Sequence, residues 1–457
     1  MMQKALSSRE IAFLALQQVE QEAAYANLAL KKLLDQAGLP AQEAKLATEI
    51  VYGASRLRYA LEHLLRGLLT RPLDQLQKDV RIILELSLYQ LHYLSQEPYA
   101  VVDEGVKLAK KYCNPPLAKL TNAVLRNYLR KAEAQGKAAL LPGEDDLRAW
   151  LRISQSYPAW LVDYLLAHFG PEQAKQFCLS GNERPGVWLR CNTLRNSREE
   201  LLETLSAAGC RAQAAGFAPE TIRVTANAAP ATEYIRQGLC LAQGPASQLV
   251  AHALSPRPGS RVLDLAAAPG GKTSHLAEKM KNSGELHAFD LHEHKIPLIR
   301  DNCRRLGIDI VRAEAADSCL LPESYREWAD HVLLDAPCSG LGVLNARPDS
   351  RYHKQAQDIP ELAKLSFKLL EAAGSYLKPG GLLCYSTCTI TEEENSGNLH
   401  RFLEKHKEFQ PAPMEGILEM LPRSEDRQAA RKGELQLLPQ EQGAEGFFIS
   451  LLRKRPD

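Results

Sequence analysis

Residues 262–273 read Val-Leu-Asp-Leu-Ala-Ala-Ala-Pro-Gly-Gly-Lys-Thr. An apolar run leads into a turn of small residues and a helical pattern follows, so the segment predicts a strand–turn–helix unit. Small side chains let a ligand approach the backbone, and the N–H groups that begin the helix suit a carboxylate or phosphate. The glycine spacing matches neither the dinucleotide fingerprint nor the P-loop. Alone, the segment is equally compatible with an ordinary tight turn.

The residues around this segment continue the same pattern over 236–457. Alternating strands and helices of this kind predict a doubly wound parallel sheet, that is, a Rossmann-like α/β domain. The predicted strands span 261–265, 285–290, 308–313, 331–335, 381–387 and 446–452, and the predicted helices span 272–281, 293–306 and 360–377.

Two carboxylates follow predicted strands of this domain. Asp290 ends the strand after residues 262–273, and Asp317 follows a later strand. Ligands of doubly wound sheets bind beyond the carboxyl ends of the strands, where an acidic residue can accept the hydroxyls of a ribose. Each carboxylate alone is compatible with a helix cap or a surface group, whereas the two together predict a nucleoside pocket.

Two cysteines stand beyond the ends of two further predicted strands. Residues 335–340 read Asp-Ala-Pro-Cys-Ser-Gly, which places Asp335 and Cys338 at a turn stiffened by proline. Residues 386–389 read Ser-Thr-Cys-Thr, which places Cys388 at the end of the next strand. That position favours a function for Cys388, whereas Cys384, in the middle of the strand, is expected to pack in the core.

The first 133 residues show helical periodicity without strand signals, which predicts an all-helical bundle. Ser7 and Glu10 form a predicted capping box, and apolar stripes cover 44–69, 77–95 and 100–131. We expect a linker at 134–155 and a small α/β subdomain at 156–235. Its predicted elements are strands at 187–191 and 221–225 and a helix at 197–208.

The bundle is basic over residues 101–134, which contain seven lysines and arginines and three acidic residues and therefore have a net charge of +4. Such a stretch fits two interpretations, a solvated helix face or a surface that contacts phosphates.

The motifs at 266–273, 335–340 and 386–389 closely resemble those of the RNA cytosine-C5 methyltransferases of the NOL1/NOP2/Sun group. The pairing of Asp-Ala-Pro-Cys with Thr-Cys about fifty residues later is highly specific. The resemblance covers essentially the whole chain. Residues 1–133 are similar to the NusB-type RNA-binding domain fused to the bacterial 16S rRNA enzymes of this family, through residues 50–56 and 88–91, and residues 188–193 resemble the family's segment before the catalytic domain, placed at 236–457.

The resemblance implies S-adenosylmethionine as the cofactor and a cytosine of 16S rRNA, nucleotide 967, as the target. It implies that Asp290 binds the ribose hydroxyls, that Asp317 approaches the adenine, and that Asp335 also borders the cofactor. The residues it assigns to the methionine moiety are Ala266, Ala267, Ala268, Pro269, Gly270, Gly271 and Lys272.

The resemblance also implies Cys388 as the nucleophile and Cys338 as the second cysteine, which serves product release. Thiolate addition at C6 makes C5 of cytosine enamine-like, and Asp335 can hydrogen-bond the N3/N4 edge where electron density develops. Cys338 is the candidate for removing the C5 proton. A free thiol has a pKa near 8.5, so Cys388 requires a local lowering whose source the sequence does not identify.

The chain departs from the family's pattern at three places. Ala266 stands where many relatives carry cysteine, and residues 243–248 lack the usual acid after the first glutamine. The loop 344–349 lacks the paired arginines common before its Pro-Asp, so Arg347, Arg351 and Lys354 are the expected substitutes in phosphate contacts.

The composition bounds the classes of protein that remain. A chain of 457 residues suggests about two to four domains, and 45% hydrophobic with 24% charged residues excludes a disordered chain or a coiled-coil rod. The net charge of +1 does not exclude RNA binding. No membrane span or secretory segment is evident, which predicts a cytoplasmic protein without membrane partners. The ten cysteines contain no CxxC, so we expect free thiols and no metal site.

Three functions stay open at this point. The first is methylation of 16S rRNA, before the subunit is fully assembled, by a monomer that binds RNA and not DNA. The second is the same chemistry on another rRNA or tRNA cytosine, against which the fused helical domain weighs. The third is a non-catalytic RNA-binding assembly factor, against which the intact Asp335, Cys338 and Cys388 weigh.

Overall fold

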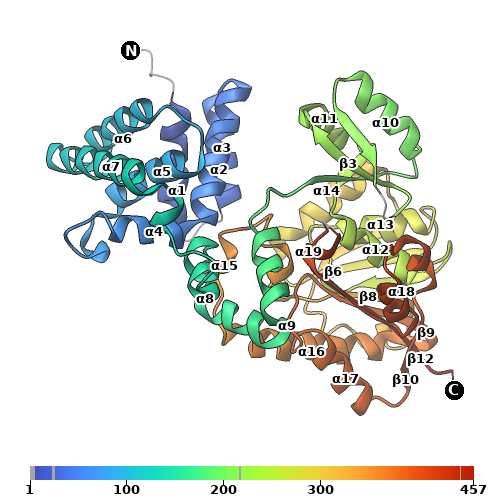
Figure 1. Ribbon diagram of the computed structural model, residues 1–457. Helices are drawn as coiled ribbons and strands as arrows, with labels where there is room; N and C mark the ends of the chain where they lie inside the picture. Colours follow the sequence, from blue (N-terminus) through green and yellow to red (C-terminus); the bar gives the residue numbers. More distant parts are fainter. Residues whose placement is uncertain (1–5, 23–25, 216–217, 443, 457) are drawn as a thin grey trace. The chain divides into compact units, whose positions relative to one another are not determined.

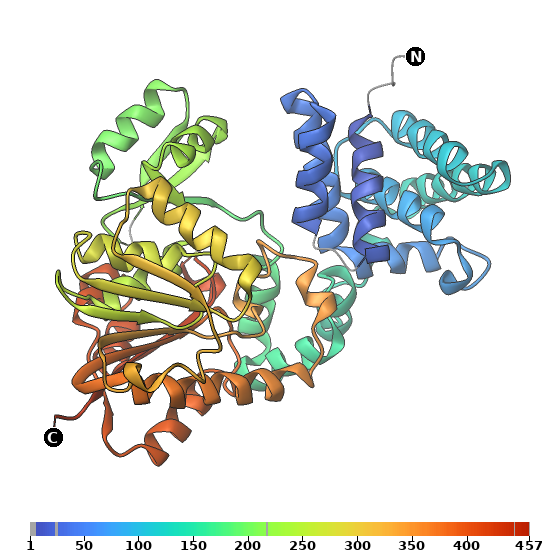
Figure 2. The ribbon, with the colours of Figure 1, turned by 180° about the vertical axis from the view of Figure 1, so that it is seen from behind.

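The computed structural model describes residues 6–22, 26–215, 218–442 and 444–456. The chain divides into two compact units, Met1–Glu183 with Leu344–Lys354, and Arg184–Val343 with Gln355–Asp457 (Figures 1 and 2). Among the described helices, none combines the length and the apolar character that a membrane crossing requires.

The first unit is helical, as predicted. Its core surrounds α5, whose side chains are buried along most of its length. The helices are α1 (Ser8–Glu22), α2 (Ala26–Ala37), α3 (Ala41–Arg56), α4 (Arg58–Arg66), η1 (Leu73–Gln75), α5 (Lys78–Tyr93), α6 (Pro98–Tyr112), α7 (Pro115–Gln135), η2 (Ala138–Leu140), α8 (Leu147–Ala149), η3 (Trp150–Ser154), α9 (Ala159–Ser180) and α15 (Ser350–His353).

Two predicted helical stripes each contain a break. The stripe 44–69 divides at Leu57 into α3 and α4. The stripe 100–131 divides before α7, where the Asn114 side chain accepts a hydrogen bond from the Leu117 amide (3.0 Å) and proline opens the helix. The predicted capping box of α1 is half formed. The Glu10 amide donates to Ser7 Oγ (3.2 Å), but the Glu10 carboxylate accepts from the Tyr112 hydroxyl (2.5 Å).

The segment 134–155, expected to be a linker, carries short helical turns and buries the side chains of Trp150 and Leu151. Helix α9 lies within the compact unit Met1–Glu183 with Leu344–Lys354. The Tyr157 hydroxyl just before α9 donates to the Cys178 carbonyl within it (3.2 Å), so the segment packs on itself inside this unit.

The second unit begins with a small antiparallel sheet of strand order β2-β3-β1-β4. The predicted strands at 187–191 and 221–225 and the helix at 197–208 are present, the helix with a full capping box between Ser197 and Glu200. The elements are β1 (Val187–Cys191), α10 (Arg198–Ala207), β2 (Arg211–Ala214), β3 (Thr221–Ala226), α11 (Ala229–Arg236) and β4 (Cys240–Ala242).

The larger sheet has strand order β10-β12-β9-β8-β5-β6-β7, and β11 pairs with β12. The pairs among β5 to β9 are parallel, as predicted, but the closing strand β12 runs antiparallel to β9, so the sheet is mixed. The strands are β5 (Arg261–Asp264), β6 (Glu285–Asp290), β7 (Val311–Ala315), β8 (Ala329–Asp335), β9 (Leu377–Thr387), β10 (Phe409–Pro411), β11 (Glu434–Leu437) and β12 (Phe447–Lys454).

Helices cover both faces of this sheet. α12, α13 and α14 pack on one face, and α16 and α17 pack on the other (Figures 1 and 2). The helices are α12 (Pro245–Leu254), α13 (Gly271–Lys279), η4 (Glu293–Lys295), α14 (Ile296–Leu306), η5 (Glu323–Tyr325), η6 (Leu341–Val343), α16 (Asp358–Tyr376), α17 (Ser396–Lys405), η7 (Glu415–Met420), α18 (Ser424–Arg431) and α19 (Pro439–Gln442).

Strand β7 begins three residues later than the predicted 308–313. The apolar Ile308 closes α14 instead, since its amide donates to the Cys303 carbonyl (2.9 Å) after Gly307 turns the chain with φ +75°. The Asp309 amide then donates to the Asn282 side chain (3.0 Å), which leaves the ladder to start at Val311.

The basic stretch 101–134 is partly engaged within the helical unit. Lys107 pairs with two carboxylates of its own helix, and Lys131 donates to the Gly67 carbonyl (2.8 Å). Lys110, Lys119 and Arg130 are exposed and form no ion pair with the residues that the structure describes. These three side chains are therefore the candidates for contacts with RNA phosphates.

Arg351 does not serve as the predicted phosphate contact. Its side chain is fully buried, and its guanidinium lies 4.0 Å from the centre of the Tyr157 ring. It donates to the Asn182 side chain (2.9 Å) and to the Gly181 carbonyl (3.1 Å). A buried arginine whose two terminal nitrogens donate to carbonyl oxygens stabilises the fold and is out of reach of an RNA phosphate.

We therefore expect Arg351→Ala to lower the free energy of unfolding of the helical unit by about 2–4 kcal/mol, because buried acceptors lose their donors. Denaturant unfolding followed by circular dichroism measures this change. Arg347→Ala, an exposed arginine of the same segment, should shift stability by less than about 0.5 kcal/mol. Equal unfolding midpoints for the two variants would contradict the structural role of Arg351.

Candidate active site

The turn after β5 lies where the order of strands in the sheet reverses. β5 pairs with β6 on one side and with β8 on the other, so the chain leaves β5 at the switch point of the sheet. Helix α13 then begins at Gly271, after Gly270 with φ +97°. That left-handed conformation favours glycine and explains why the turn carries it.

Hydrogen bonds fix the shape of this turn. The Ala267 amide donates to the Phe289 carbonyl (2.8 Å), and the Gly270 amide donates to the Ala267 carbonyl (2.7 Å). The Ala268 amide donates to the carboxylate of Asp290 (3.3 Å), which also accepts from the His292 amide (3.0 Å). The structure thus brings the predicted turn 266–272 together with Asp290.

Asp317 lies two residues beyond Ala315, the strand neighbour of Asp290. The Ala316 amide donates to the Asp290 carbonyl (3.1 Å), and the exposed Asp317 carboxylate accepts from the Cys319 amide (2.9 Å). Asp317 is therefore positioned by the β6–β7 pairing at the same edge of the sheet.

Lys272, the second residue of α13, forms an ion pair with Asp335 at the end of β8. Its Nζ lies 2.7 Å from Oδ2 of Asp335, and the Ser386 hydroxyl donates to the other carboxylate oxygen (2.9 Å). Burial opposes the charge on Lys272, but Asp335 outweighs it and raises the pKa of the ammonium. Lys272 therefore stays positively charged beside the two predicted cysteines.

Asp264, at the end of β5, is a buried carboxyl group under the turn. The Thr273 hydroxyl donates to its Oδ2 (2.6 Å), while its Oδ1 has no hydrogen-bond partner among the described residues. Burial raises the pKa of Asp264 to about 7 despite that hydrogen bond. An unsatisfied acceptor of this kind is suited to a donor group from a ligand.

Cys338 and Cys388 meet at the ends of β8 and β9, with their sulfur atoms 3.5 Å apart. The hydrogen bond to Cys388 and burial raise the pKa of the Cys338 thiol well above its ordinary value. Cys338 therefore keeps its proton and can donate it toward the sulfur of Cys388. Together with the Lys272 ammonium, this thiol is an electrostatic source of stabilisation for negative charge on Cys388 that sequence reasoning could not name.

Glu394 ties the two cysteine-bearing turns together, and sequence reasoning missed it. Its fully buried carboxylate accepts from the Ser339 amide (2.7 Å), the Ser339 hydroxyl (2.6 Å) and the Thr391 hydroxyl (2.6 Å). Ser339 also bonds Thr389 (2.6 Å). Residues 392–394 are all glutamate, so the sequence contains no signal that singles out the third.

One group of potential metal ligands comes together in the described part of the chain: Glu220, His252 and His275, with ligand atoms within 4.8 Å of one another. Hydrogen bonds and ion pairs connect the three side chains in this structure. Both imidazole Nε2 atoms lie 2.7 Å from the Glu220 carboxylate, and the Lys279 ammonium lies 3.2 Å from Nδ1 of His252. An ammonium donor at Nδ1 keeps the proton on Nε2, which then donates to Glu220.

Comparisons with known proteins agree with this architecture. The family model described as 16S rRNA methyltransferase RsmB/F matches residues 251–453. The RsmF/B-like ferredoxin-like domain matches 157–232, and the NusB family matches 6–130.

Curated relatives match over nearly the whole chain. The probable ribosomal RNA small subunit methyltransferase B of Bacillus subtilis is 36% identical over 99% of this chain and 100% of its own length. The ribosomal RNA small subunit methyltransferase B of Klebsiella pneumoniae is 34% identical over 88% of this chain and 91% of its own. The crystal structure of PH0851 covers 97% of both chains with a TM-score of 0.81 and 27% identity. The chain therefore belongs to the ribosomal RNA small subunit methyltransferase B family.

Proposed function

We propose that this protein transfers a methyl group from S-adenosylmethionine to C5 of a cytosine in 16S rRNA, with nucleotide 967 as the predicted position. The proposal rests above all on one observation. Two cysteine sulfurs lie 3.5 Å apart beside an aspartate, at the sheet edge that also carries the glycine-containing turn. C5 methylation through a covalent adduct needs a nucleophile and a group that removes the C5 proton, and two cysteines in contact can supply both.

The residues around the turn fit a methionine–nucleoside cofactor. The unpartnered Oδ1 of Asp264 can accept from an ammonium, and the start of α13 can donate to a carboxylate. Asp290 and Asp317 follow β6 and β7 at the carboxyl ends of the strands, which supports their assignment to the ribose and the adenine, and Asp335 is assigned to the cofactor through its contact with Lys272. When bound, the cofactor supplies an electrophilic methyl group.

The chain's own residues then act in a defined order. The Cys388 thiolate forms a bond to C6 of the cytosine, and the electron pair moves toward C5 and the N3/N4 edge. Asp335 lies at the end of β8, held by Lys272 and Ser386, where it can bind that edge. C5 takes the methyl group, and the C5 proton must then leave so that the C5–C6 bond reforms and expels Cys388.

Cys338 can accept that proton only as the thiolate, so it must first lose its own proton to solvent, after the adduct has formed. Before addition, the hydrogen bond with Cys388 is the largest cause of the raised pKa of Cys338, followed by burial and then by the charge of Cys388. A Cys388 sulfur bonded to carbon carries no negative charge, so the two contributions of Cys388 weaken while burial remains, and the pKa of Cys338 falls. The pair is thereby coupled, since forming the adduct prepares the second thiol for its release.

The helical unit supports RNA as the partner. It matches the NusB family and exposes Lys110, Lys119 and Arg130, which can contact phosphates without reading sequence. Binding of a ribosomal precursor by a monomer remains part of this proposal. A purely non-catalytic assembly factor would have no need of the contact between Cys338 and Cys388.

The direct test is methylation of unmodified 16S rRNA by purified protein with labelled cofactor, followed by bisulfite sequencing. We expect one modified cytosine, and no methylation by Cys388→Ala, because its sulfur forms the bond to the base. Cofactor binding by Cys388→Ala should stay within about twofold of the wild type. Cys113→Ala, a partly exposed cysteine of the helical unit, is the matched control and should methylate normally. Turnover by Cys388→Ala would overturn the assignment.

Cys338→Ala should instead trap the enzyme on its product. Addition and methyl transfer can still proceed, but release through the second thiol is lost. A denaturing gel should show a protein–RNA species of reduced mobility that depends on both cofactor and Cys388. Normal turnover without this species would reduce Cys338 to a packing residue.

Asp290→Ala should weaken cofactor binding by about 1.5–3 kcal/mol, the range for hydrogen bonds to a charged group. Isothermal titration calorimetry with S-adenosylmethionine measures this change. Asp301→Ala, an exposed aspartate on α14, serves as the control with an unchanged dissociation constant. Equal affinity of the Asp290 variant and the wild type would remove Asp290 from the ribose site.

A further inference from the structure

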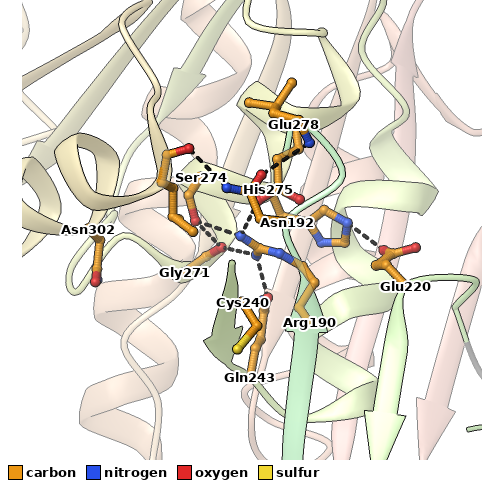
Figure 3. A network of polar contacts seen from close by, with 12 residues as sticks. Arg190, Asn192, Glu220, Cys240, Gln243, Gly271, Ser274, His275, Glu278 and Asn302 are labelled. Carbon is orange, nitrogen blue, oxygen red and sulfur yellow. Dashed lines mark hydrogen bonds and ion pairs between the residues drawn. The ribbon is translucent and has the colours of Figure 1, made fainter. Parts of the chain in front are cut away.

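A buried arginine of the small sheet reaches the turn of the candidate active site. Arg190 lies near the end of β1, and its side chain is fully buried between that sheet and α13 (Figure 3). Its guanidinium donates to four acceptors, three of which belong to α13: Gln243 Oε1 (2.5 Å), the Gly271 carbonyl (2.7 Å), Ser274 Oγ (2.9 Å) and Glu278 Oε1 (2.8 Å).

The contact with Gly271 links Arg190 to the turn directly. Gly271 is the first residue of α13 and follows Gly270, whose φ of +97° reverses the chain. The Gly271 carbonyl accepts from Arg190 and from Ser274 Oγ (3.0 Å), and Ser274 itself accepts from Arg190. The guanidinium therefore holds the start of α13 at two points that are fixed relative to each other by its planar fork.

A second connection holds the same turn from α14. Asn302 donates to the Pro269 carbonyl (2.8 Å), and Arg305 donates to the Asn302 side chain (2.5 Å). Arg305 also donates to the Ile235 carbonyl of the small subdomain. Both connections lead from the small subdomain to a carbonyl of the turn, one through Arg190 to Gly271 and the other through Arg305 and Asn302 to Pro269.

Stability alone does not explain the ion pair between Arg190 and Glu278. Both side chains are almost fully excluded from water, with 0% and 1% of their surfaces exposed. Burial raises the pKa of Glu278 even though Arg190 lowers it, so the pair does not recover its full desolvation cost. Apolar residues of similar volume could fill this space equally well, but they could not donate to the Gly271 carbonyl.

We propose that Arg190 is a positioning residue for cofactor binding. It fixes the carbonyl of Gly271 and thereby the shape of the turn 266–271, so that the affinity for S-adenosylmethionine depends on a residue of the small subdomain. This inference rests on the proposed function, because the turn must be where the cofactor binds. The small subdomain then acts on the cofactor site as well as packing beside it.

The experiment separates positioning from stability with a double variant. Arg190→Met should lower both the melting temperature and the affinity for S-adenosylmethionine, since Glu278 is left buried without its partner. Arg190→Met with Glu278→Leu removes both charges and should recover most of the melting temperature. Its dissociation constant for S-adenosylmethionine should nevertheless stay about tenfold above the wild-type value, the loss typical of one charged hydrogen bond.

Two further variants complete the design. Leu205→Ala empties part of the core of the small subdomain and should lower the melting temperature without changing the dissociation constant. Arg190→Lys keeps the charge for Glu278 but lacks the fork, so it should melt near the wild type and still bind the cofactor more weakly.

Calorimetry and thermal unfolding of the full chain without RNA give both quantities. Wild-type affinity in either the double variant or Arg190→Lys would overturn the positioning role while leaving the proposed function standing. Wild-type protein that binds no S-adenosylmethionine would overturn the proposed function and the inference together.

Discussion

The parallel pairing of β8 with β9 is the constraint on which the candidate active site depends. The register places Asp335 opposite Ser386, so both chains leave the sheet at the same edge and Cys338 and Cys388 follow within a few residues. Fifty residues separate the two cysteines in the chain, and no local structure could bring them to 3.5 Å. A slip of one residue would turn one set of side chains to the other face of the sheet and separate the pair.

Three carboxyl groups around this edge differ in what surrounds them. Glu394 is satisfied by an amide and hydroxyl groups and holds the two turns together. Asp335 faces a lysine and a hydroxyl and remains partly exposed. One oxygen of Asp264 accepts from a hydroxyl, the other has no hydrogen-bond partner in the part of the chain that the structure describes, and burial raises the pKa of this carboxyl group to about 7. The carboxyl group thus has three different roles here. Glu394 connects two turns, Asp335 is a charged partner of Lys272, and Asp264 has an oxygen that can accept a hydrogen bond from a ligand.

The chain segment between the two cysteines also contributes to the helical unit. Leu344–Lys354 leave the catalytic unit and return to it at α16, so the chain passes between the two units at three points. Within the helical unit, two side chains of this segment donate hydrogen bonds to backbone carbonyls. The Arg351 guanidinium donates to the Gly181 carbonyl, and the Tyr352 hydroxyl donates to the Arg56 carbonyl (2.8 Å). Arg351, which the sequence suggested as a phosphate contact, therefore stabilises the helical unit instead, because its buried guanidinium cannot reach a phosphate.

The sequence by itself determined the class of each region and the chemistry-bearing motifs. Period-3.6 stripes, strand–helix alternation and turn motifs depend on neighbours in the chain, so 1–133 was recognisable as helical and 285–290 as a strand. The direction of β12, the start of β7 and the breaks within two helical stripes depended on hydrogen bonds to partners that periodicity does not reveal. In the sequence, nothing distinguishes Arg190, Glu394 and Arg351 from charged residues that are exposed to solvent. Only the tertiary structure decided their roles, because the energy of a buried charge is set by the acceptors and donors that distant segments bring to it.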